Sequence, residues 1–154
     1  MDSPDHAGVK VPPPFIFLGG LLLGWALEAI EPIDGIESPW RWIALGVGVL
    51  VFALLDPPAM GRFQRAGTAL PPFRPTSAIV TDGPYRFTRN PMYIGMTVLY
   101  VGLALGFDLV WALILLPAIL LVIRFYVIAR EERYLEAKFG EGYLAYKRRV
   151  RRWL

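Results

Sequence analysis

The sequence predicts an all-α integral membrane protein with four transmembrane helices, followed by a helical C-terminal segment on the cytoplasmic side. Three observations support this fold class. Of the 154 residues, 55% are hydrophobic, whereas a soluble domain is nearer to about 45–50% apolar. The apolar residues gather in four long runs, and most basic residues gather in two of the segments outside those runs. We expect the whole chain to form one functional domain.

The four apolar runs cover residues 14–30, 40–55, 91–107 and 109–128. Each is close to the minimum of about 17–20 residues that a helix needs to cross a bilayer. Together they predict a four-span bundle over residues 14–128. The remaining segments are a tail at residues 1–13, a loop at residues 56–90 and a C-terminal segment at residues 129–154.

The charge distribution predicts which ends of the spans face the cytoplasm. The loop between the first two spans has three acidic residues against Arg41, and the turn around Asp108 has no basic residue. By contrast, loop 56–90 carries five arginines and segment 129–154 carries eight lysines and arginines. By the positive-inside rule both basic segments, and so both termini, are cytoplasmic, at the inner membrane if the protein is bacterial.

Only Lys10 is a firm positive charge before the first run. A cleaved signal peptide needs a basic start and a small-residue cleavage site, and neither is clear, so we interpret the run as a span. Several spans also carry glycines that would let helices approach closely in lipid. These packing positions are Gly20, Gly24, Gly46, Gly48, Gly102 and Gly106.

The segments outside the spans differ in their expected order. Residues 1–13 resemble a floppy polar tail, while the prolines of loop 56–90 stiffen it. We expect Pro71–Pro75 to be extended, Ala78–Thr81 to be strand-like and Asp82–Pro84 to turn. The fourth helix should continue to about Phe139, where Gly140 and Gly142 break it.

A final amphipathic helix is expected over Tyr143–Trp153. Such a helix can lie on an anionic membrane surface. It can equally fold back as a lid over Gly83–Gly95, and the sequence leaves both positions open.

The residue inventory excludes several kinds of chemistry. The chain has no cysteine and one histidine, His6. Thiolate nucleophiles and disulfides are therefore excluded, and a metal site or a Ser-His-Asp triad is disfavoured. The remaining polar groups are Arg, Glu, Asp, Tyr, Asn and the backbone, which favours a borrowed reactive cofactor.

The stretch Gly83–Gly95 lies where the basic loop meets the third span. Asn90 is a favoured helix N-cap and Pro91 suits the first helical position. The helix N-terminus beside Arg86 and Arg89 would suit a bound carboxylate or phosphate. The alternative is a capped span whose arginines contact lipid head groups.

On the same predicted face, Glu131 and Glu132 follow the fourth span. Adjacent helical residues diverge by about 100°, so one carboxylate can point into the bundle while the other meets solvent or an arginine. The alternative is a solvated charge run with Arg130 and Arg133.

Two motifs carry a family resemblance: G-P-Y-R-x-x-R-N-P-M-Y-x-G (residues 83–95) and E-E-x-x-L-x-x-x-F-G-x-x-Y-x-x-Y-K-x-R-V-x-R-W (residues 131–153). In this order and spacing they resemble the isoprenylcysteine carboxyl methyltransferases and the wider group of membrane phospholipid methyltransferases. The resemblance runs from Thr68 to the C-terminus. It implies methyl transfer from S-adenosyl-L-methionine to a lipophilic acceptor that arrives from the bilayer, with a carboxylate of the isoprenylcysteine type favoured. Membrane lipids are then expected partners and nucleic acid is not.

The resemblance also implies roles for particular residues. The cofactor-binding residues it implies are Tyr85, Arg89, Asn90, Pro91, Tyr93, Gly95, Glu131 and Glu132. The catalytic residues it implies are Arg89, Arg149 and Glu132, with the two arginines at the substrate end. The sequence departs from the eukaryotic prenylcysteine enzymes at Asn90, where they have histidine, and asparagine cannot act as a base. A carboxylate acceptor needs no base, whereas an amine would need one, for which a glutamate is the evident candidate.

Two other functions compete with this interpretation. Membrane sterol and enone reductases that use NADPH carry a similar C-terminal element, although those chains are much longer. A non-catalytic membrane protein that binds lipid or a partner is the third possibility. Binding of S-adenosylmethionine, NADPH or neither would separate the three.

Overall fold

The computed structural model describes residues 6–35, 39–69 and 74–153, and its regular elements in those ranges are helical. In chain order they are α1 (Pro13–Ile30), α2 (Trp40–Arg65), a 3₁₀ turn η1 (Gly83–Arg86), α3 (Pro91–Gly106), α4 (Val110–Val122), a π-helical segment η2 (Ile123–Ile128), α5 (Ala129–Phe139) and α6 (Glu141–Arg149). The predicted all-α class is confirmed. The strand-like piece expected at Ala78–Thr81 is not formed.

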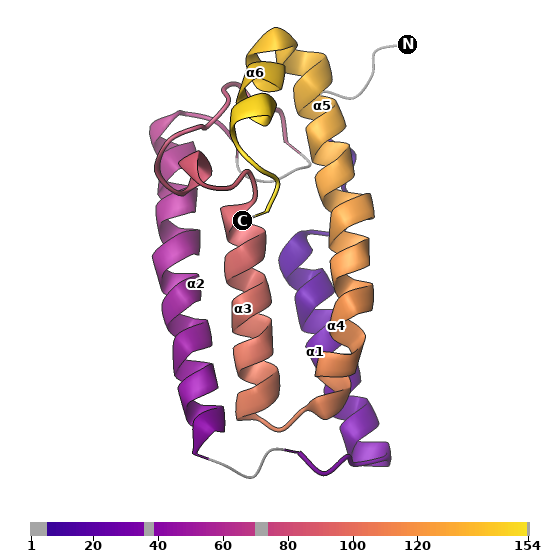
Figure 1. Cartoon of the computed structure of the whole chain (residues 1–154). Coiled ribbons are helices and arrows are strands. Elements are labelled where there is room, and N and C mark those ends of the chain that lie inside the picture. The colour runs from indigo at the N-terminus through magenta and orange to yellow at the C-terminus, as the bar shows by residue number, and fades with distance from the viewer. Residues whose placement is uncertain (1–5, 36–38, 70–73, 154) are drawn as a thin grey trace.

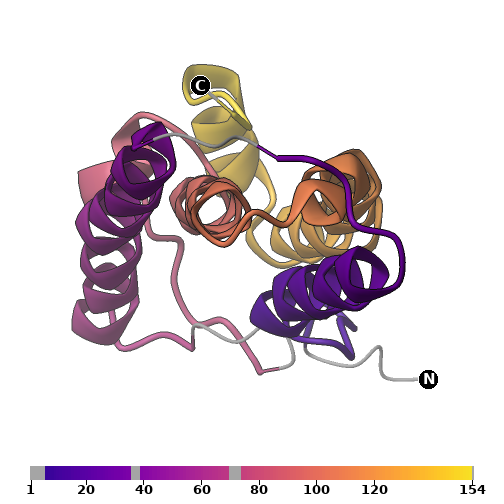
Figure 2. The same cartoon turned by 90° about the horizontal axis from the view of Figure 1, so that it is seen from below.

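The bundle is built from two helix pairs, with α2 packed along α3 and α1 packed along α4 (Figure 2). A Cβ atom at Gly102 would lie 3.0 Å from the Cα of Gly48, and one at Gly24 would lie 2.6 Å from the backbone nitrogen of Ala112. The packing role predicted for these glycines is confirmed. For Gly46 it is wrong, because no atom of another element lies within 4 Å of its Cβ position.

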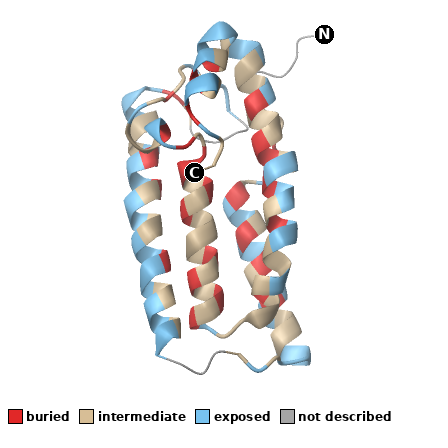
Figure 3. Cartoon of the chain, viewed as in Figure 1, coloured by how far each residue is buried: buried red, intermediate tan, exposed pale blue. Residues whose placement is uncertain are grey.

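Among the residues that the structure describes, three helices are long and apolar enough to cross a membrane: α1, α2 and the continuous helix Val110–Phe139. The fourth apolar helix, α3, has 16 residues. It rises about 24 Å, less than the roughly 30 Å of a hydrocarbon core, so the fourth span stays a prediction. Large apolar residues such as Phe15, Leu22 and Leu54 are exposed, as suits a lipid-facing surface. Figure 3 shows exposed positions along the lengths of the helices.

Helix α2 continues ten residues beyond the predicted end of its span, through Pro57 and Pro58 to Arg65. The composition predicts a loop from Asp56 onward. The last part of α2 instead packs against η1 and α3, and this packing keeps it helical. The connection to α3 is therefore shorter than the predicted loop 56–90. Of the extended stretch expected at Pro71–Pro75, residues 71–73 lie outside the described residues.

Residues 6–12 are not a loose tail. Val9 is 1% exposed and packs in the main apolar core. Arg130 donates a hydrogen bond to the carbonyl oxygen of Gly8, and Tyr126 Oη accepts one from the backbone nitrogen of Lys10. The prediction of a floppy tail was wrong because the polar composition of this segment gave no indication of these contacts.

One end of the bundle, here called the polar end, is formed by α5, α6, η1 and the described part of the N-terminal segment, which lie together (Figure 1). The links α1–α2 and α3–α4 lie at the opposite end. Helix α5 ends at Gly140 (φ 51°), as predicted, but Gly142 does not break the chain because it lies within α6. Helix α6 ends at Arg149 and Val150 is extended. The helix therefore ends four residues before Trp153, where the sequence predicted its end.

Candidate active site

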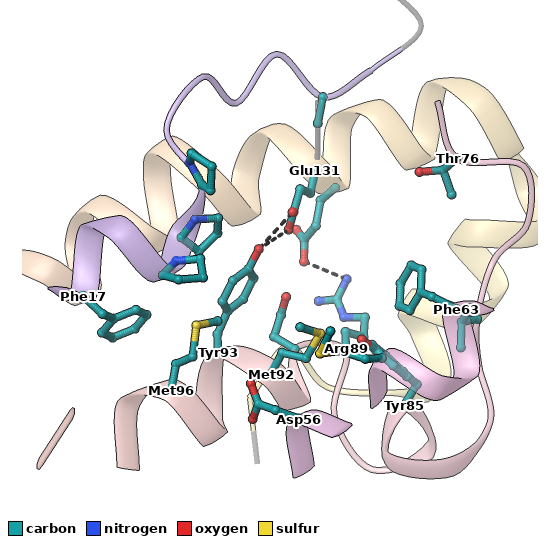
Figure 4. Close-up of a pocket in the computed structure, with 18 of the residues that line it drawn as sticks. Phe17, Asp56, Phe63, Thr76, Tyr85, Arg89, Met92, Tyr93, Met96 and Glu131 are labelled. Carbon is teal, nitrogen blue, oxygen red and sulfur yellow. Dashed lines mark hydrogen bonds and ion pairs between the residues drawn. The ribbon is translucent and has the colours of Figure 1, made fainter. Parts of the chain in front are cut away.

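A cavity of about 590 Å³ opens inside the polar end of the bundle and is lined by α1, α2, α3, α5, α6 and the segments between α2 and α3. Its floor is apolar and includes Phe17, Leu21, Phe52, Leu99 and Leu103. Its upper walls carry the polar groups, several of which Figure 4 shows around the opening. Pockets for small molecules and cofactors have volumes of about 300–1,000 Å³ and a similar mixed lining.

Arg89 and Glu132 form the buried ionic centre of the site. Their side chains are each 8% exposed, and Nη1 of Arg89 lies 3.0 Å from Oε1 of Glu132. This contact lacks hydrogen-bond geometry, so both Nε and Nη1 of Arg89 remain without a hydrogen-bond acceptor. Buried donors of this kind normally have a partner, and a guanidinium matches a carboxylate or phosphate.

Arg152 completes the same cluster from the C-terminal segment. Its Nε donates to Oε1 of Glu132 at 3.0 Å, and its Nη2 donates to Oε2 at 2.6 Å. These hydrogen bonds raise the pKa of Arg152. One carboxylate therefore joins two arginines that are 63 residues apart in sequence, one before α3 and one after α6.

The neighbouring carboxylate, Glu131, faces α3. The hydroxyl of Tyr93 lies 2.9 and 3.0 Å from its two carboxylate oxygens and donates to them, as Figure 4 shows. Both glutamates line the cavity. The expectation that one carboxylate would point into the bundle while the other met solvent or an arginine agrees with the structure, because Glu131 meets Tyr93 of α3 and Glu132 meets two arginines.

Hydrogen bonds to backbone carbonyl oxygens hold the end of the C-terminal segment against the start of α3. The carbonyl oxygen of Arg152 accepts hydrogen bonds from Thr88 Oγ1 at 3.0 Å and from Asn90 Nδ2 at 2.9 Å, while Arg89 N donates to the carbonyl oxygen of Arg151. Asn90 occupies the N-cap position as predicted, but its side chain makes no cap hydrogen bond. Its amide is used to hold the C-terminal segment instead.

Helix α6 folds back on the 83–95 motif, the second of the two positions that the sequence left open. The hydroxyl of Tyr146 donates to the carbonyl oxygen of Tyr85 at 2.8 Å. Burial raises the pKa of Tyr143 to about 12 and raises the pKa of Tyr85 and Tyr146 further. These phenols are therefore neutral at physiological pH and can stack or donate hydrogen bonds.

Six of the residues implied by the family resemblance line the cavity: Tyr85, Arg89, Asn90, Tyr93, Glu131 and Glu132. Pro91 begins α3 beside them. Gly95 faces α2, where a Cβ atom would overlap the carboxylate of Asp56. Arg149 is exposed and does not line the cavity, so its substrate role stays a prediction.

Two residues at the site were not anticipated from the sequence. Arg152 takes the inward position that the resemblance suggested for Arg149, although Arg152 is itself a position of the second motif and could have been considered on that ground. Asp56 lines the cavity and is 2% exposed. The charge at the end of an apolar run could have marked it, since buried carboxylates are costly and commonly functional.

Comparison with known proteins identifies the family of the chain. An uncharacterized protein of Haemophilus influenzae is 45% identical over 65 residues, which are 41% of this chain and all of that protein. A model of the phospholipid methyltransferase family matches residues 42–142, from the start of α2 into α6. That match covers well over half of the chain and includes Arg89, Glu131 and Glu132. The protein therefore belongs to the phospholipid methyltransferase family.

Proposed function

We propose that the protein transfers a methyl group from S-adenosyl-L-methionine to a lipophilic acceptor at the cytoplasmic face of the membrane. Family membership implies a membrane methyltransferase, and the cofactor and acceptor are the parts proposed here. The observation that carries the proposal is the buried pair Arg89–Glu132, which has guanidinium donors left over inside a cavity of cofactor size.

The polar half of the cavity fits the groups that this cofactor presents. Nε of Arg89, which has no hydrogen-bond acceptor in the structure, suits the carboxylate of the cofactor. Glu131, oriented by Tyr93, can accept hydrogen bonds from ribose hydroxyls or from an amino group. Neutral rings, including Tyr85 and Tyr143, can pack against the base or the sulfonium. The cofactor supplies an activated methyl group, so the protein's work is alignment and electrostatics.

The apolar half of the cavity suits the hydrocarbon part of an acceptor. It lies between α1 and α2 over α3 and continues directly from the charged end. Helix α2 packs on α3 and α1 packs on α4, whereas α1 and α2 lie apart from each other (Figure 2). Residues of both α1 and α2 line the cavity. An acceptor tail can therefore lie among Phe17, Phe52 and Leu103 while its head group meets the charged residues.

The acceptor head group could belong to either of two chemical classes. A carboxylate of the isoprenylcysteine type is already a nucleophile and needs a cation to steer it. An amine needs an acid–base partner to lose its proton. Arg89 is the only cation among the described residues that line the cavity, and it is also the best partner for the cofactor carboxylate.

The proposed orientation puts the polar end of the bundle in the cytoplasm. The described residues of that end carry the arginines of loop 56–90 and the basic C-terminal segment, and the positive-inside rule assigns such segments to the cytoplasmic side. The cofactor would then enter from the cytosol and the acceptor from the bilayer.

The test is transfer of a labelled methyl group. Purified protein is incubated with methyl-labelled S-adenosylmethionine and a bacterial lipid extract, and label is counted in the organic phase. We expect label to accumulate with wild type and to fall at least about tenfold with Glu132→Gln. Absence of label with any lipid or prenylcysteine analogue, in folded protein, would favour a non-catalytic lipid-binding protein. Oxidation of NADPH instead would favour the membrane reductase.

A further inference from the structure

We propose that Asp56 receives the head group of the acceptor and selects an amine over a carboxylate. This inference rests on the proposed function, since it concerns the acceptor end of the same cavity. It assigns a specificity-determining role to a residue outside both sequence motifs.

Asp56 is a carboxylate without a partner in a buried position. The residue is 2% exposed and its Oδ2 has no hydrogen-bond donor. The other two carboxylates of the cavity have partners: Glu131 has the Tyr93 hydroxyl, and Glu132 has Arg89 and Arg152. A buried carboxylate without a donor destabilises the fold, so its presence calls for a ligand that supplies one.

The fold makes a specific place for this side chain. Asp56 lies on the face of α2 that packs against α3, and a Cβ atom at Gly95 would overlap its Oδ2. Glycine at position 95 therefore leaves room for the carboxylate at the seam between the two helices. The resemblance assigned Gly95 to cofactor binding, whereas its contact here is with Asp56.

Asp56 also lies where the two halves of the cavity meet. Four residues of α2 line the cavity at helical spacing: Phe52, Asp56, Met60 and Phe63. The apolar floor begins beside Phe52, and Tyr85 of the polar wall lines the same cavity. An acceptor with its tail on the floor would bring its head group to Asp56 (Figure 4).

The charge of the lining favours a cationic head group. The described lining residues include three carboxylates, Asp56, Glu131 and Glu132, against one guanidinium. A carboxylate beside Asp56 would put two like charges together in a place with little water, which is strongly unfavourable. An ammonium would pair with Asp56, which could then take up the proton that the ammonium loses when it becomes a neutral amine.

The experiment compares three amphiphiles that share one tail: dodecylamine, dodecan-1-ol and dodecanoate. Each is titrated calorimetrically into purified protein in maltoside micelles near neutral pH, with affinity expressed as mole fraction in the micelle. S-adenosylhomocysteine is titrated separately, so that loss of the cofactor site and loss of the acceptor site are told apart.

We expect wild type to bind dodecylamine at least about tenfold more tightly than dodecanoate. Asp56→Asn keeps the size of the side chain and removes its charge, so the ratio should fall about tenfold while dodecan-1-ol and S-adenosylhomocysteine bind as before. The control is Asp82→Asn, a carboxylate at the same end of the bundle that pairs with Arg62 outside the cavity. That variant should keep the wild-type ratio.

Two results would overturn the proposal: equal or tighter binding of dodecanoate by wild type, or an unchanged ratio in Asp56→Asn. The first is decisive even if the variant does not fold. Failure of S-adenosylhomocysteine to bind wild type would contradict the proposed function separately, and the amphiphile ratios would still decide the role of Asp56.

Discussion

Arg152 joins the last residues of the chain to the end of the long fourth helix through two hydrogen bonds to Glu132, at 2.6 and 3.0 Å. Glu132 also pairs with Arg89 at 3.0 Å. The last residues of the chain thus hold in place Glu132, which lines the cavity. The site is therefore built around an ionic cluster whose members come from three separate parts of the chain.

Arg152→Ala is expected to weaken binding of S-adenosylhomocysteine at least about tenfold, or about 1.4 kcal/mol. Without Arg152 the buried Glu132 has Arg89 as its remaining partner. Glu132 then draws Arg89 toward itself and away from the ligand, which weakens binding. Calorimetric titration measures the effect. Arg149→Ala is the matched control, because Arg149 is exposed three residues earlier, and it should change affinity less than about twofold. Equal losses in both variants would contradict this role for Arg152.

Tyr93→Phe is expected to weaken ligand binding several-fold, because Glu131 loses the hydroxyl that orients both of its oxygens. Tyr100→Phe, on the same helix, removes a buried hydroxyl that donates to the carbonyl oxygen of Ala112. That control should cost about 1 kcal/mol of stability and leave affinity unchanged. Thermal unfolding measures the stability of both variants, and titration measures their affinity for the ligand. If Tyr93→Phe bound the ligand as tightly as Tyr100→Phe, Glu131 would not be a ligand-binding group.

Gly95→Ala is expected to destabilise the protein by about 1–3 kcal/mol, as for other overpacked positions. Asp56→Ala in the same chain should recover part of that loss, because the added methyl group collides with the Asp56 carboxylate. Gly102→Ala is the control: it meets the backbone at Ala44 and Gly48, so Asp56→Ala should not relieve it. If denaturation showed that the stability losses of Gly95→Ala and Asp56→Ala simply add, the proposed packing of the Asp56 carboxylate against Gly95 would be contradicted.

Alkaline pH should loosen α6. Burial raises the pKa of Tyr143 from 10.0 to about 12, so the folded state holds this proton more tightly than the unfolded state. The stabilisation is fully present below about pH 10 and is lost as pH rises toward 12, with a slope of up to about 1.4 kcal/mol per pH unit. Unfolding temperatures from pH 9 to 11.5 should fall more steeply in wild type than in Tyr143→Phe. Parallel curves would show that Tyr143 does not contribute.

Much of the fold could be predicted from local sequence. Apolar runs and the glycines Gly24, Gly48 and Gly102 indicated helices and where they touch, because both signals are local. The two motifs indicated that α3 and α5 meet at one end, and Tyr93–Glu131 and Arg89–Glu132 are contacts between them. The end of α2 was missed, since tertiary packing holds Pro57 and Pro58 in a helix that composition alone would end.

The site was predicted less completely, for a geometric reason. The family resemblance assigned Arg149 to the substrate end and gave no role to Arg152, but the chain becomes extended at Val150. This change of conformation turns Arg152 toward Glu132 and leaves Arg149 exposed. Asp56 was missed because its importance lies in two long-range facts, the space at Gly95 and the lack of a donor. Neither is visible in the spacing of residues.

The most direct test of the central claim is titration of S-adenosylhomocysteine into the purified, folded protein, with NADPH as the comparison ligand. The account predicts micromolar binding of S-adenosylhomocysteine, weakened at least about tenfold by Glu132→Gln, and no binding of NADPH. Binding of NADPH alone, or of neither ligand by protein that unfolds cooperatively on heating, would contradict the account.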